Sequence, residues 1–538
     1  MKKKTASQKH PLSDQNPPTV AELARIVADL RIGFAEESVR HEREVAVLIE
    51  QIRLLKSLLY GRSSEKNRPV DPNSLQGFLP FEVDEPPVAP VIPAVTETLP
   101  VKAHSRGKPG RRPLPENLPR IEILHDLPEA EKICACGTAL ARIGEEVTER
   151  LDIVPAKVQV IRHVRLKYAC RGCEGVESLD GAVKLAPLPP QIIPQGIVTA
   201  GLLAHVAIAK FADAIPLYRQ EQQFRRLGLE ISRGTLAGWL ILVAAVCLRL
   251  RELLQLEILT GPVINMDETR IQVLREPGRA NTSTSHMWVC RGGPPEKPGI
   301  LFRYFPSRAG KVAEEILKNY RGYLQTDGYI GYEAIGTREG IRHLGCWAHV
   351  RRKFMDVLKG DLETTKTGVA HEVIDSIGKL YAIEAKSRQQ NLSAIELVTL
   401  RKHESKPILD TLKELLDRRS LTTPPKCLLG KAIFYALNQW PLLIVFLESA
   451  DLRLDNNLAE NAIRPFAVGR KNWLFSGSPR GAEASATFFS LIETAKANAL
   501  EPFAYLKFLF SEIPSAKSDA ELKALLPQYA DRNRILSQ

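Results

Sequence analysis

Apolar residues recur every seven positions near the start of the chain, within residues 20–62. The heptad positions are Val27, Phe34, His41, Leu48 and Leu55. This period keeps one stripe of a helix facing a partner helix, and the charged run around His41 would set its register. We expect a coiled-coil helix over 20–62 that joins two copies of the chain. The alternative is a helix packed on its own protein.

Three helix-patterned stretches follow one another within residues 191–258. They are VTAGLLAHVAIAKFAD, PLYRQEQQFRRLG and SRGTLAGWLILVAAVC. Gly228 ends the second stretch and Ser232 can cap the third, whose first turn exposes Arg233 and Thr235. The arrangement is typical of a helix-turn-helix, in which these two residues would contact DNA, although any small helical bundle gives a similar pattern.

Short apolar runs of strand type begin at Pro262. Strands are predicted at 262–266, 286–290, 301–306, 323–326 and 341–346, with a helix at 310–320 after the third strand and another beginning at Trp347. The order is therefore strand, strand, strand, helix, strand, helix or loop, strand, helix. It favours a mixed sheet of ribonuclease-H type as the α/β core of a mainly α, multidomain chain.

A helix-rich segment without strand pattern occupies residues 361–447, where Pro407 and Pro424 should act as breaks. This helical insertion would divide the catalytic domain into a first part, 259–360, and a second part, 448–500. A helical tail, 501–538, would follow. In the second part, Asp455, Asn456 and Asn457 are N-cap candidates for a helix that Pro465 should stop early.

Composition describes the remaining parts of the chain. Residues 1–19 read as a disordered tail, and residues 63–120 are rich in proline and read as an extended linker. No apolar segment of secretory length follows MKKK, and the apolar stretch 236–248 is too short to span a bilayer. We expect a cytoplasmic protein without a membrane partner.

The charge balance is basic, with 74 Lys and Arg against 62 Asp and Glu and a net charge of +12. Such a surface suits contact with phosphate, although basic proteins are common. The end of the linker, RGKPGRRPLP, could lie in a narrow minor groove of DNA as a basic arm; the alternative is a solvated linker. Its cations are Arg106, Lys108, Arg111 and Arg112.

Four of the eight cysteines form two close pairs. They are Cys134 and Cys136 in ICACG, and Cys170 and Cys173 in YACRGC. Two such pairs favour one tetrahedral, structural Zn²⁺ site that closes a small module over 121–190, although one intervening residue in the first pair is fewer than usual. Two disulfides are the alternative. Cys346 and His349 also have metal-ligand spacing, but no second pair is nearby in sequence, and we expect a structural role.

Three carboxylates stand where local sequence can direct them at one point. Asp267 follows the first predicted strand, Asp327 follows the fourth, and Glu460 lies on the helix after the insertion, with Arg464 on the same face. Each acid alone reads as a surface residue, as most carboxylates do. Together they can hold Mg²⁺ or Mn²⁺, which prefer oxygen ligands and can catalyse phosphoryl transfer as a pair.

Four long motifs link these acids to a known family. VINMDET, LQTDGYIGY, GCWAHVRRKF and DNNLAENAIRPFAVGRKNWLFSGS resemble the large transposase of the insertion-sequence sixty-six family, and the resemblance covers about residues 58–510. It implies a DDE-type, ribonuclease-H-like catalytic domain with Asp267, Asp327 and Glu460 as the acidic triad. It also implies a zinc-binding module, and members of this family are often encoded with small accessory proteins.

The resulting hypothesis is a DNA transposase that binds and cleaves the ends of an insertion element and joins the freed 3′-hydroxyls to target DNA. A metal-dependent nuclease without strand transfer and a non-catalytic DNA-binding regulator are the alternatives. Trp473 is expected to pack in the core. Further candidate phosphate contacts are Arg351, Arg352, Lys353, Arg464, Arg470 and Lys471.

Folded protein should contain one zinc ion per chain, held by the four paired cysteines. Metal analysis of the purified protein measures this directly. Treatment with a reducing agent is the matching control, because a zinc-bound module keeps its structure under conditions that open disulfides. Folded protein that lacks zinc would contradict the assignment.

Overall fold

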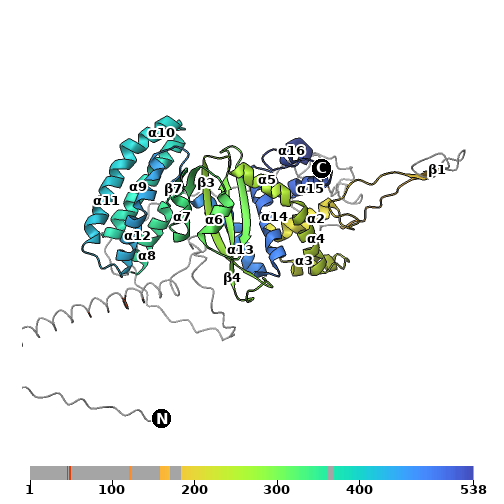
Figure 1. The fold of residues 1–538 in the computed structure, drawn as a ribbon, viewed down its shortest axis with the longest axis horizontal. Helices are drawn as coiled ribbons and strands as arrows, with labels where there is room; N and C mark the ends of the chain where they lie inside the picture. The colour runs from red at the N-terminus through yellow and green to blue at the C-terminus, as the bar shows by residue number, and fades with distance from the viewer. Residues whose placement is uncertain are drawn as a thin grey trace, which may run out of the picture. The chain divides into compact units, whose positions relative to one another are not determined.

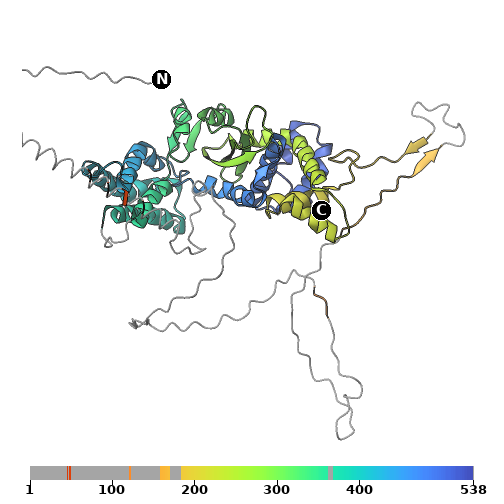
Figure 2. The ribbon, with the colours of Figure 1, turned by 90° about the horizontal axis from the view of Figure 1, so that it is seen from below.

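The computed structural model describes residues 158–169, 183–360 and 368–536, with residues 41, 45, 48, 49, 52 and 120–122 as isolated positions (Figures 1 and 2). Most of the expected coiled coil, the basic arm and all four paired cysteines lie outside the described residues. The contacts divide the chain into two units, Leu75–Val164 and the remainder. The sheet and the helices of the described structure belong to the second of these units, from Arg165 onward.

A mixed sheet forms the centre of this unit. Its strands are β3 (Val263–Val273), β4 (Thr284–Gly292), β5 (Gly299–Phe305), β6 (Gly322–Gln325), β7 (Ile341–Leu344) and the short β8 (Phe475–Ser476). The order is β5-β4-β3-β6-β7, and β8 pairs with the far end of β3. The pairs β3–β4 and β4–β5 are antiparallel, whereas β3–β6 and β6–β7 are parallel. The predicted mixed sheet and its element order are confirmed.

Helices before the sheet confirm the three predicted stretches. They are α2 (Ala200–Phe211), α3 (Leu217–Arg226) and α4 (Arg233–Val246), followed by α5 (Leu248–Ile258). The Ser232 side chain accepts the backbone N–H of Thr235 at 3.1 Å, so α4 begins where the sequence predicts. A small hairpin of β1 (Lys167–Ala169) and β2 (Val183–Leu185) precedes this group.

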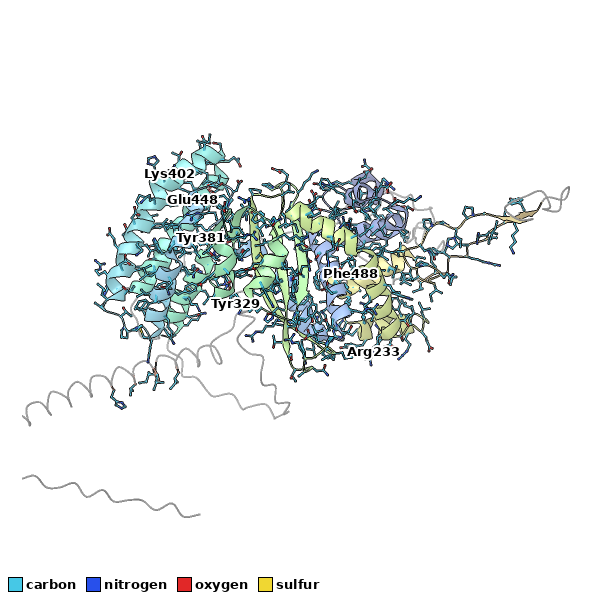
Figure 3. All side chains as sticks on the ribbon, viewed as in Figure 1. Arg233, Tyr329, Tyr381, Lys402, Glu448 and Phe488 are labelled. Carbon is cyan, nitrogen blue, oxygen red and sulfur yellow. The ribbon has the colours of Figure 1, made fainter. Side chains whose placement is uncertain are left out.

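The helix α14 (Pro479–Ala497) connects the sheet with these helices (Figure 1). The Ser490 hydroxyl accepts the N–H of Phe302 at 2.7 Å and the Thr494 hydroxyl accepts that of Ile300 at 3.0 Å. These bonds satisfy the outer edge of β5, which would otherwise expose donors and acceptors. On the same helix Phe488, labelled in Figure 3, stacks on Phe211 of α2 at 4.9 Å between ring centres.

Helices fill the described part of the segment between β7 and Glu460, as predicted (Figure 2). After α8 (Trp347–Gly360) come α9 (Val369–Gln389), α10 (Ala394–Leu400), the π-helix η3 (Arg401–Ser405), α11 (Lys406–Ser420), α12 (Leu428–Leu443) and η4 (Val445–Leu447). They enclose a second apolar core, separate from the core around the sheet. By length and composition alone, Leu428–Leu447 could cross a membrane; here Ile433 and Leu443 belong to the second core.

The remaining helices pack after or beside the sheet. They are α6 (Gly310–Leu317), η2 (Ile330–Tyr332), α7 (Glu333–Gly336), α13 (Asn457–Trp473), α15 (Pro502–Glu512), η5 (Ile513–Ser515), α16 (Asp519–Ala524) and α17 (Arg532–Leu536). Among these, α13 carries Glu460 and packs on β3 and β4.

Two proline predictions were wrong. Pro465 lies inside α13, which continues to Trp473, because Ala462, Ile463 and Phe466 bury that face of the helix in the sheet core. Tertiary packing here outweighs the lost backbone hydrogen bond. Pro407 stands at the start of α11 and does not interrupt the helix there, because the π-helical turn before it joins α10 to α11. In this wider turn the backbone hydrogen bonds change their spacing before the proline is reached. Pro424 does separate two helices, α11 and α12.

A buried arginine in the π-helix joins the insertion to the segment that leads into α13. The Arg401 side chain is 1% exposed and forms two hydrogen bonds with Glu384 at 2.7 and 2.9 Å. Its remaining donors reach the carbonyls of Phe446, Ser449 and Leu452 at 2.6 to 2.8 Å. One guanidinium thus fixes the path of the chain before Glu460.

Replacing Arg401 by leucine should lower the free energy of unfolding by about 3–5 kcal/mol, because it leaves the Glu384 carboxylate buried without its cation. The matched control is Lys386→Ala on the same helix as Glu384. Its ion pair with Glu404 is about half exposed, so its loss should cost less than about 1 kcal/mol. Chemical denaturation of both variants measures the difference, and equal losses would contradict the anchoring role of Arg401.

Candidate active site

The two aspartates stand at the same level of adjacent strands. In the parallel pair β3–β6, Asn265 lies opposite Gln325. Asp267 and Asp327 each follow two residues later in their own segment, so they stand at the same level. Asp327 follows β6, as predicted. Asp267 does not end its strand: β3 continues to Val273, paired with β4, because the alternation of Thr269, Ile271 and Val273 as buried residues persists. The strand merely passes the end of β6 at this point.

Glu460 approaches the aspartates from the first turn of α13. Desolvation raises the pKa of Asp267 well above its usual range, and the nearby carboxylates of Glu268, Asp327 and Glu460 raise it further. The three predicted acids are therefore close enough to influence one another. Glu460 acts on Asp267 in this way although the insertion separates it from the aspartates in sequence.

Three buried amide side chains join the segments that carry these acids. The Asn265 amide donates to the side-chain oxygens of Gln325 at 2.9 Å and Asn456 at 3.1 Å, and Asn456 donates to the carbonyl of Met266 at 2.8 Å. All three amides are at most 4% exposed. Asn265 precedes Asp267 by two residues on β3, a spacing that keeps side chains on one face. Gln325 ends β6 two residues before Asp327, and Asn456 caps α13 four residues before Glu460. We call this group the amide network.

Further contacts extend the amide network to the neighbouring backbone. Gln325 donates to the carbonyls of Gly345 at 3.2 Å and Arg453 at 2.9 Å. Asn456 is the N-cap of α13, but its side chain bonds to the sheet and does not cap the helix. The Asp455 carboxylate accepts the backbone N–H of Asn457 at 3.1 Å. The other oxygen of the Asp455 carboxylate accepts a hydrogen bond from the Tyr381 hydroxyl at 2.8 Å. Tyr381, labelled in Figure 3, lies on α9 of the insertion.

A fourth carboxylate, Glu268, was not predicted from the sequence. Its side chain is 1% exposed and accepts hydrogen bonds from Arg308 at 2.6 Å and from the Tyr332 hydroxyl at 2.5 Å. The Arg308 guanidinium lies 3.6 Å from the ring centre of Tyr329, whose backbone N–H donates to Asp327 at 3.0 Å. This group holds the loop after Asp327. The signal in sequence was an acid directly after Asp267 in MDET, followed by the two tyrosines of DGYIGY.

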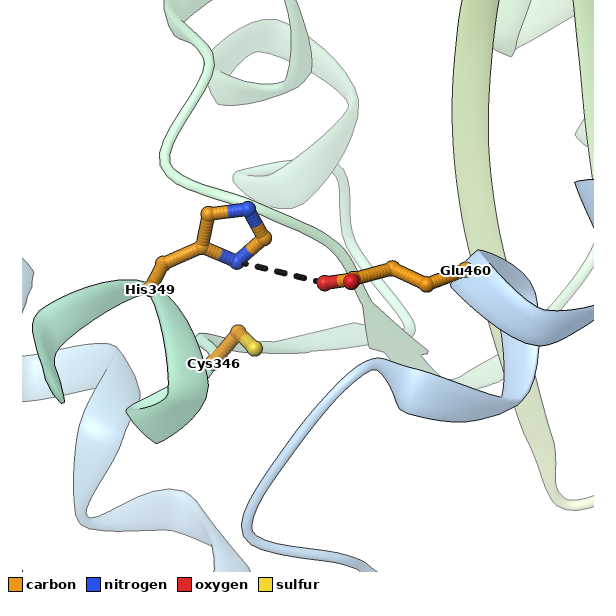
Figure 4. Close-up of side chains that lie close together, drawn as sticks. All are labelled: Cys346, His349 and Glu460. Atoms are coloured by element: carbon orange, nitrogen blue, oxygen red, sulfur yellow. Dashed lines mark ion pairs between the residues drawn. The ribbon is translucent and has the colours of Figure 1, made fainter. Parts of the chain in front are cut away.

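Cys346 and His349 flank the same site. Their ligand atoms and those of Glu460 lie within 4.8 Å of one another (Figure 4). Glu460 also lies 3.7 Å from His349 Nδ1 and 3.5 Å from the Arg352 guanidinium. Burial raises the pKa of the Cys346 thiol to about 12. The sequence predicted a structural role for this pair because no second pair lies nearby in sequence; the fold adds one further ligand atom, from Glu460 on α13.

Most described candidates for phosphate contact are accessible. Arg233 and Thr235 at the start of α4 (Figure 3 labels Arg233), Arg351 and Lys353 on α8, and Arg464 and Lys471 on α13 are exposed. Arg352 is half-buried and points toward Glu460.

Two further residues of α13 are not exposed, and one of them was a candidate for phosphate contact. Arg470 is 7% exposed and donates to the Thr269 hydroxyl at 3.1 Å, so its guanidinium connects α13 to β3 and the proposed direct contact with phosphate is wrong. Trp473 packs edge-on against Phe466, as the core prediction stated.

Known protein families match this chain over most of its length. The model described as Transposase IS66 family matches residues 195–484, more than half of the chain. The chain belongs to this transposase family. Three further models match: zinc-finger binding domain of transposase IS66 at 131–174, IS66 C-terminal element at 490–528, and Transposase C of IS166 homeodomain at 47–123. The resemblance seen in the sequence is confirmed, and the zinc-finger match spans all four paired cysteines.

Relatives of similar length occur in Sinorhizobium fredii (strain NBRC 101917 / NGR234). The uncharacterized protein y4jD is 33% identical over 96% of this chain and 97% of its own length. The uncharacterized protein y4qI is 32% identical over 94% of this chain and 93% of its own length. The shared family therefore extends over nearly the whole chain.

Membership in a DDE transposase family implies a divalent metal, and the residues of this IS66 transposase chain fit one. Asp267 is desolvated, and the hydrogen bond given to its carboxylate is the backbone N–H of Glu268 at 2.9 Å. Burial is the main reason why the pKa of Asp267 is raised, and repulsion from the neighbouring carboxylates adds to it; a bound cation would oppose both effects. Oxygen ligands from Asp267, Asp327 and Glu460 suit a hard divalent ion.

The amide network should control how well the site holds that ion. Asn265→Leu keeps the side-chain volume but removes the donor to Gln325 and Asn456, and each acceptor left without a partner costs about 1–3 kcal/mol. We expect the affinity for Mn²⁺ to fall about 10- to 100-fold, as for other groups that orient metal ligands.

The rise in melting temperature with Mn²⁺ concentration measures this affinity, because an ion that binds the native state stabilises it. The matched control is Asn472→Leu, which removes an exposed bond to the carbonyl of Ala214. A stability loss in Asn265→Leu with unchanged Mn²⁺ dependence would show that the network supports folding alone.

Proposed function

We propose that this chain is the transposase of an insertion element, which cuts DNA at the element ends and joins the freed 3′-hydroxyls to target DNA. The observation that carries the proposal is the convergence of Asp267 and Asp327, level on parallel strands, with Glu460 from α13. The strand order β5-β4-β3-β6-β7, antiparallel on one side of β3 and parallel on the other, supports a ribonuclease-H-like catalytic domain.

The three acids would hold two Mg²⁺ or Mn²⁺ ions. When bound, such ions activate the attacking water or hydroxyl and stabilise the leaving oxygen. The chain's own part is to fix the carboxylates through the amide network and to hold the loop after Asp327 through Glu268, Arg308 and Tyr332. Arg351, Lys353 and Arg464 are exposed on the helices around the site and would bind DNA phosphates.

The other parts of the chain would serve DNA binding and assembly. We assign the helical region 191–258, with Arg233 and Thr235, to DNA contact, and the zinc module with the basic arm before it to the element ends. The N-terminal helix would pair two chains, so that both ends meet in one complex. Small accessory proteins of the same element are possible partners, and the reaction would take place in the cytoplasm.

Asp267→Asn, Asp327→Asn and Glu460→Gln should each keep DNA binding and lower strand transfer at least about 1,000-fold, because each removes a metal ligand that acts only in the reaction. The matched control is Glu333→Gln, an exposed acid on α7, which should keep full activity. The assay supplies end DNA, target plasmid and Mg²⁺, and separates joined from hydrolysed products.

Each outcome of this assay identifies one function. Joined products from the wild-type chain, lost in the three variants, support the transposase. Hydrolysed products alone from the wild-type chain would replace it with a nuclease, and DNA binding without any Mg²⁺-dependent product would leave a regulator.

A further inference from the structure

A second cluster of metal-binding groups overlaps the acidic triad at Glu460. Cys346 immediately precedes α8, His349 lies in its first turn, and Glu460 faces them from α13 (Figure 4). Their sulfur, nitrogen and oxygen atoms lie within 4.8 Å of one another. Because the two α8 residues are three apart, their side chains share one side of the helix end, and the glutamate completes the group.

Two atoms of this cluster lack the partners that buried polar atoms normally have. His349 Nδ1 and Glu460 Oε1 are both buried without a hydrogen bond among the described residues. They face each other at 3.7 Å, a separation too long for a hydrogen bond. Since most buried polar atoms are satisfied, two that are unsatisfied and point at one another indicate a missing third group between them.

The third group can be a cation that takes mixed ligands. Tetrahedral Zn²⁺ binds sulfur at about 2.3 Å, imidazole nitrogen at about 2.0–2.1 Å and carboxylate oxygen at about 2.0–2.2 Å, which places neighbouring ligand atoms somewhat closer together than in the present cluster. Side-chain rotation of Glu460 and His349, each about one-fifth exposed, can close this gap. A water would complete the fourth position, as in other sites with three protein ligands.

The thiol is already oriented for such a role. The backbone N–H of Asn456 donates to Cys346 Sγ at 3.2 Å, a bond that would strengthen once the sulfur becomes a thiolate. Metal binding would release the thiol proton to solvent. Mg²⁺ does not suit this ligand set, because it prefers hard oxygen ligands and water, whereas sulfur and imidazole select Zn²⁺ and similar ions.

We propose that Cys346, His349 and Glu460 form a binding site for a thiophilic transition metal of the Zn²⁺ class, and that its occupation withdraws Glu460 from the acidic triad. The site would therefore be inhibitory. Binding depends only on the three side chains, whereas inhibition rests on the proposed function.

Cobalt(II) tests the binding, since its absorption in the visible and near-ultraviolet range reports tetrahedral coordination and thiolate ligation. The full-length protein, with its zinc content measured first, is titrated with Co²⁺ alone. Cys346→Ser, which keeps an acceptor for Asn456, and His349→Ala should each lose one equivalent of the thiolate signal or shift its spectrum relative to wild type. Cys427→Ser, at the partly exposed N-cap cysteine of α12, is the matched control and should leave the spectrum unchanged, since serine can also cap the helix.

Inhibition of DNA cleavage by zinc tests whether occupation of this site withdraws Glu460 from the acidic triad. In Mg²⁺, added Zn²⁺ should inhibit DNA cleavage by the wild-type and Cys427→Ser proteins, and the inhibitory concentration should rise at least about tenfold in Cys346→Ser, compared with its own rate without zinc. Melting curves confirm that each variant is folded. His349→Ala provides a second test of binding if Cys346→Ser is unfolded.

The two proposals fail separately. Identical cobalt spectra in wild type and both folded site variants would overturn the metal site, whatever the activity. A lost cobalt signal in the variants, together with zinc inhibition equal to that of wild type, would overturn the inhibitory role. A cobalt signal that depends on Cys346 in a protein without any DNA cleavage would support the metal site and remove the proposed function.

Discussion

The whole candidate site depends on one buried polar junction, the amide network of Asn265, Gln325 and Asn456. Amides buried from water cost free energy unless each donor and acceptor is satisfied, and here the three satisfy one another and nearby carbonyls. These bonds stabilise the observed arrangement of β3, β6 and the start of α13. The arrangement also sets the positions of Asp267, Asp327 and Glu460, which follow the amides by two or four residues. The hydrogen bonds of the amide network therefore oppose the repulsion between these three carboxylates.

The helical insertion contributes to this junction as a rigid connection. Arg401 holds the carbonyls between η4 and α13, and Tyr381 holds Asp455 directly before the helix. With a flexible linker of the same length, bringing Glu460 to the aspartates would cost loop-closure entropy and would also have to overcome the repulsion between the carboxylates. With a packed core of its own, the insertion fixes the start of α13, and thereby the backbone of Glu460, relative to the sheet.

Local patterns were sufficient to predict the strands and their order along the chain, because alternation and helical spacing are short-range signals, and the choice of the three acids rested on the same patterns. They failed where packing outweighs local preference. Pro465 remains in a helix because one face of α13 is buried, and β3 extends past Asp267 because β4 continues to pair with it. Arg470 reads as a phosphate contact in sequence, yet the fold turns it toward Thr269. None of these outcomes follows from neighbouring residues.

The contacts of Glu460 could not be predicted for the same reason, and they explain an unusual feature of the site. A carboxylate among acids would be expected to face away from them, toward cations. Glu460 has Arg352 at 3.5 Å and His349 at 3.7 Å, and it also lies near enough to Asp267 to raise the pKa of that carboxyl. The Arg352 guanidinium lowers the cost of keeping a third negative charge near two others without forming a short, strong ion pair. A side chain held so loosely between two environments can move toward a metal on either side, which makes the occupancy of one dependent on the other.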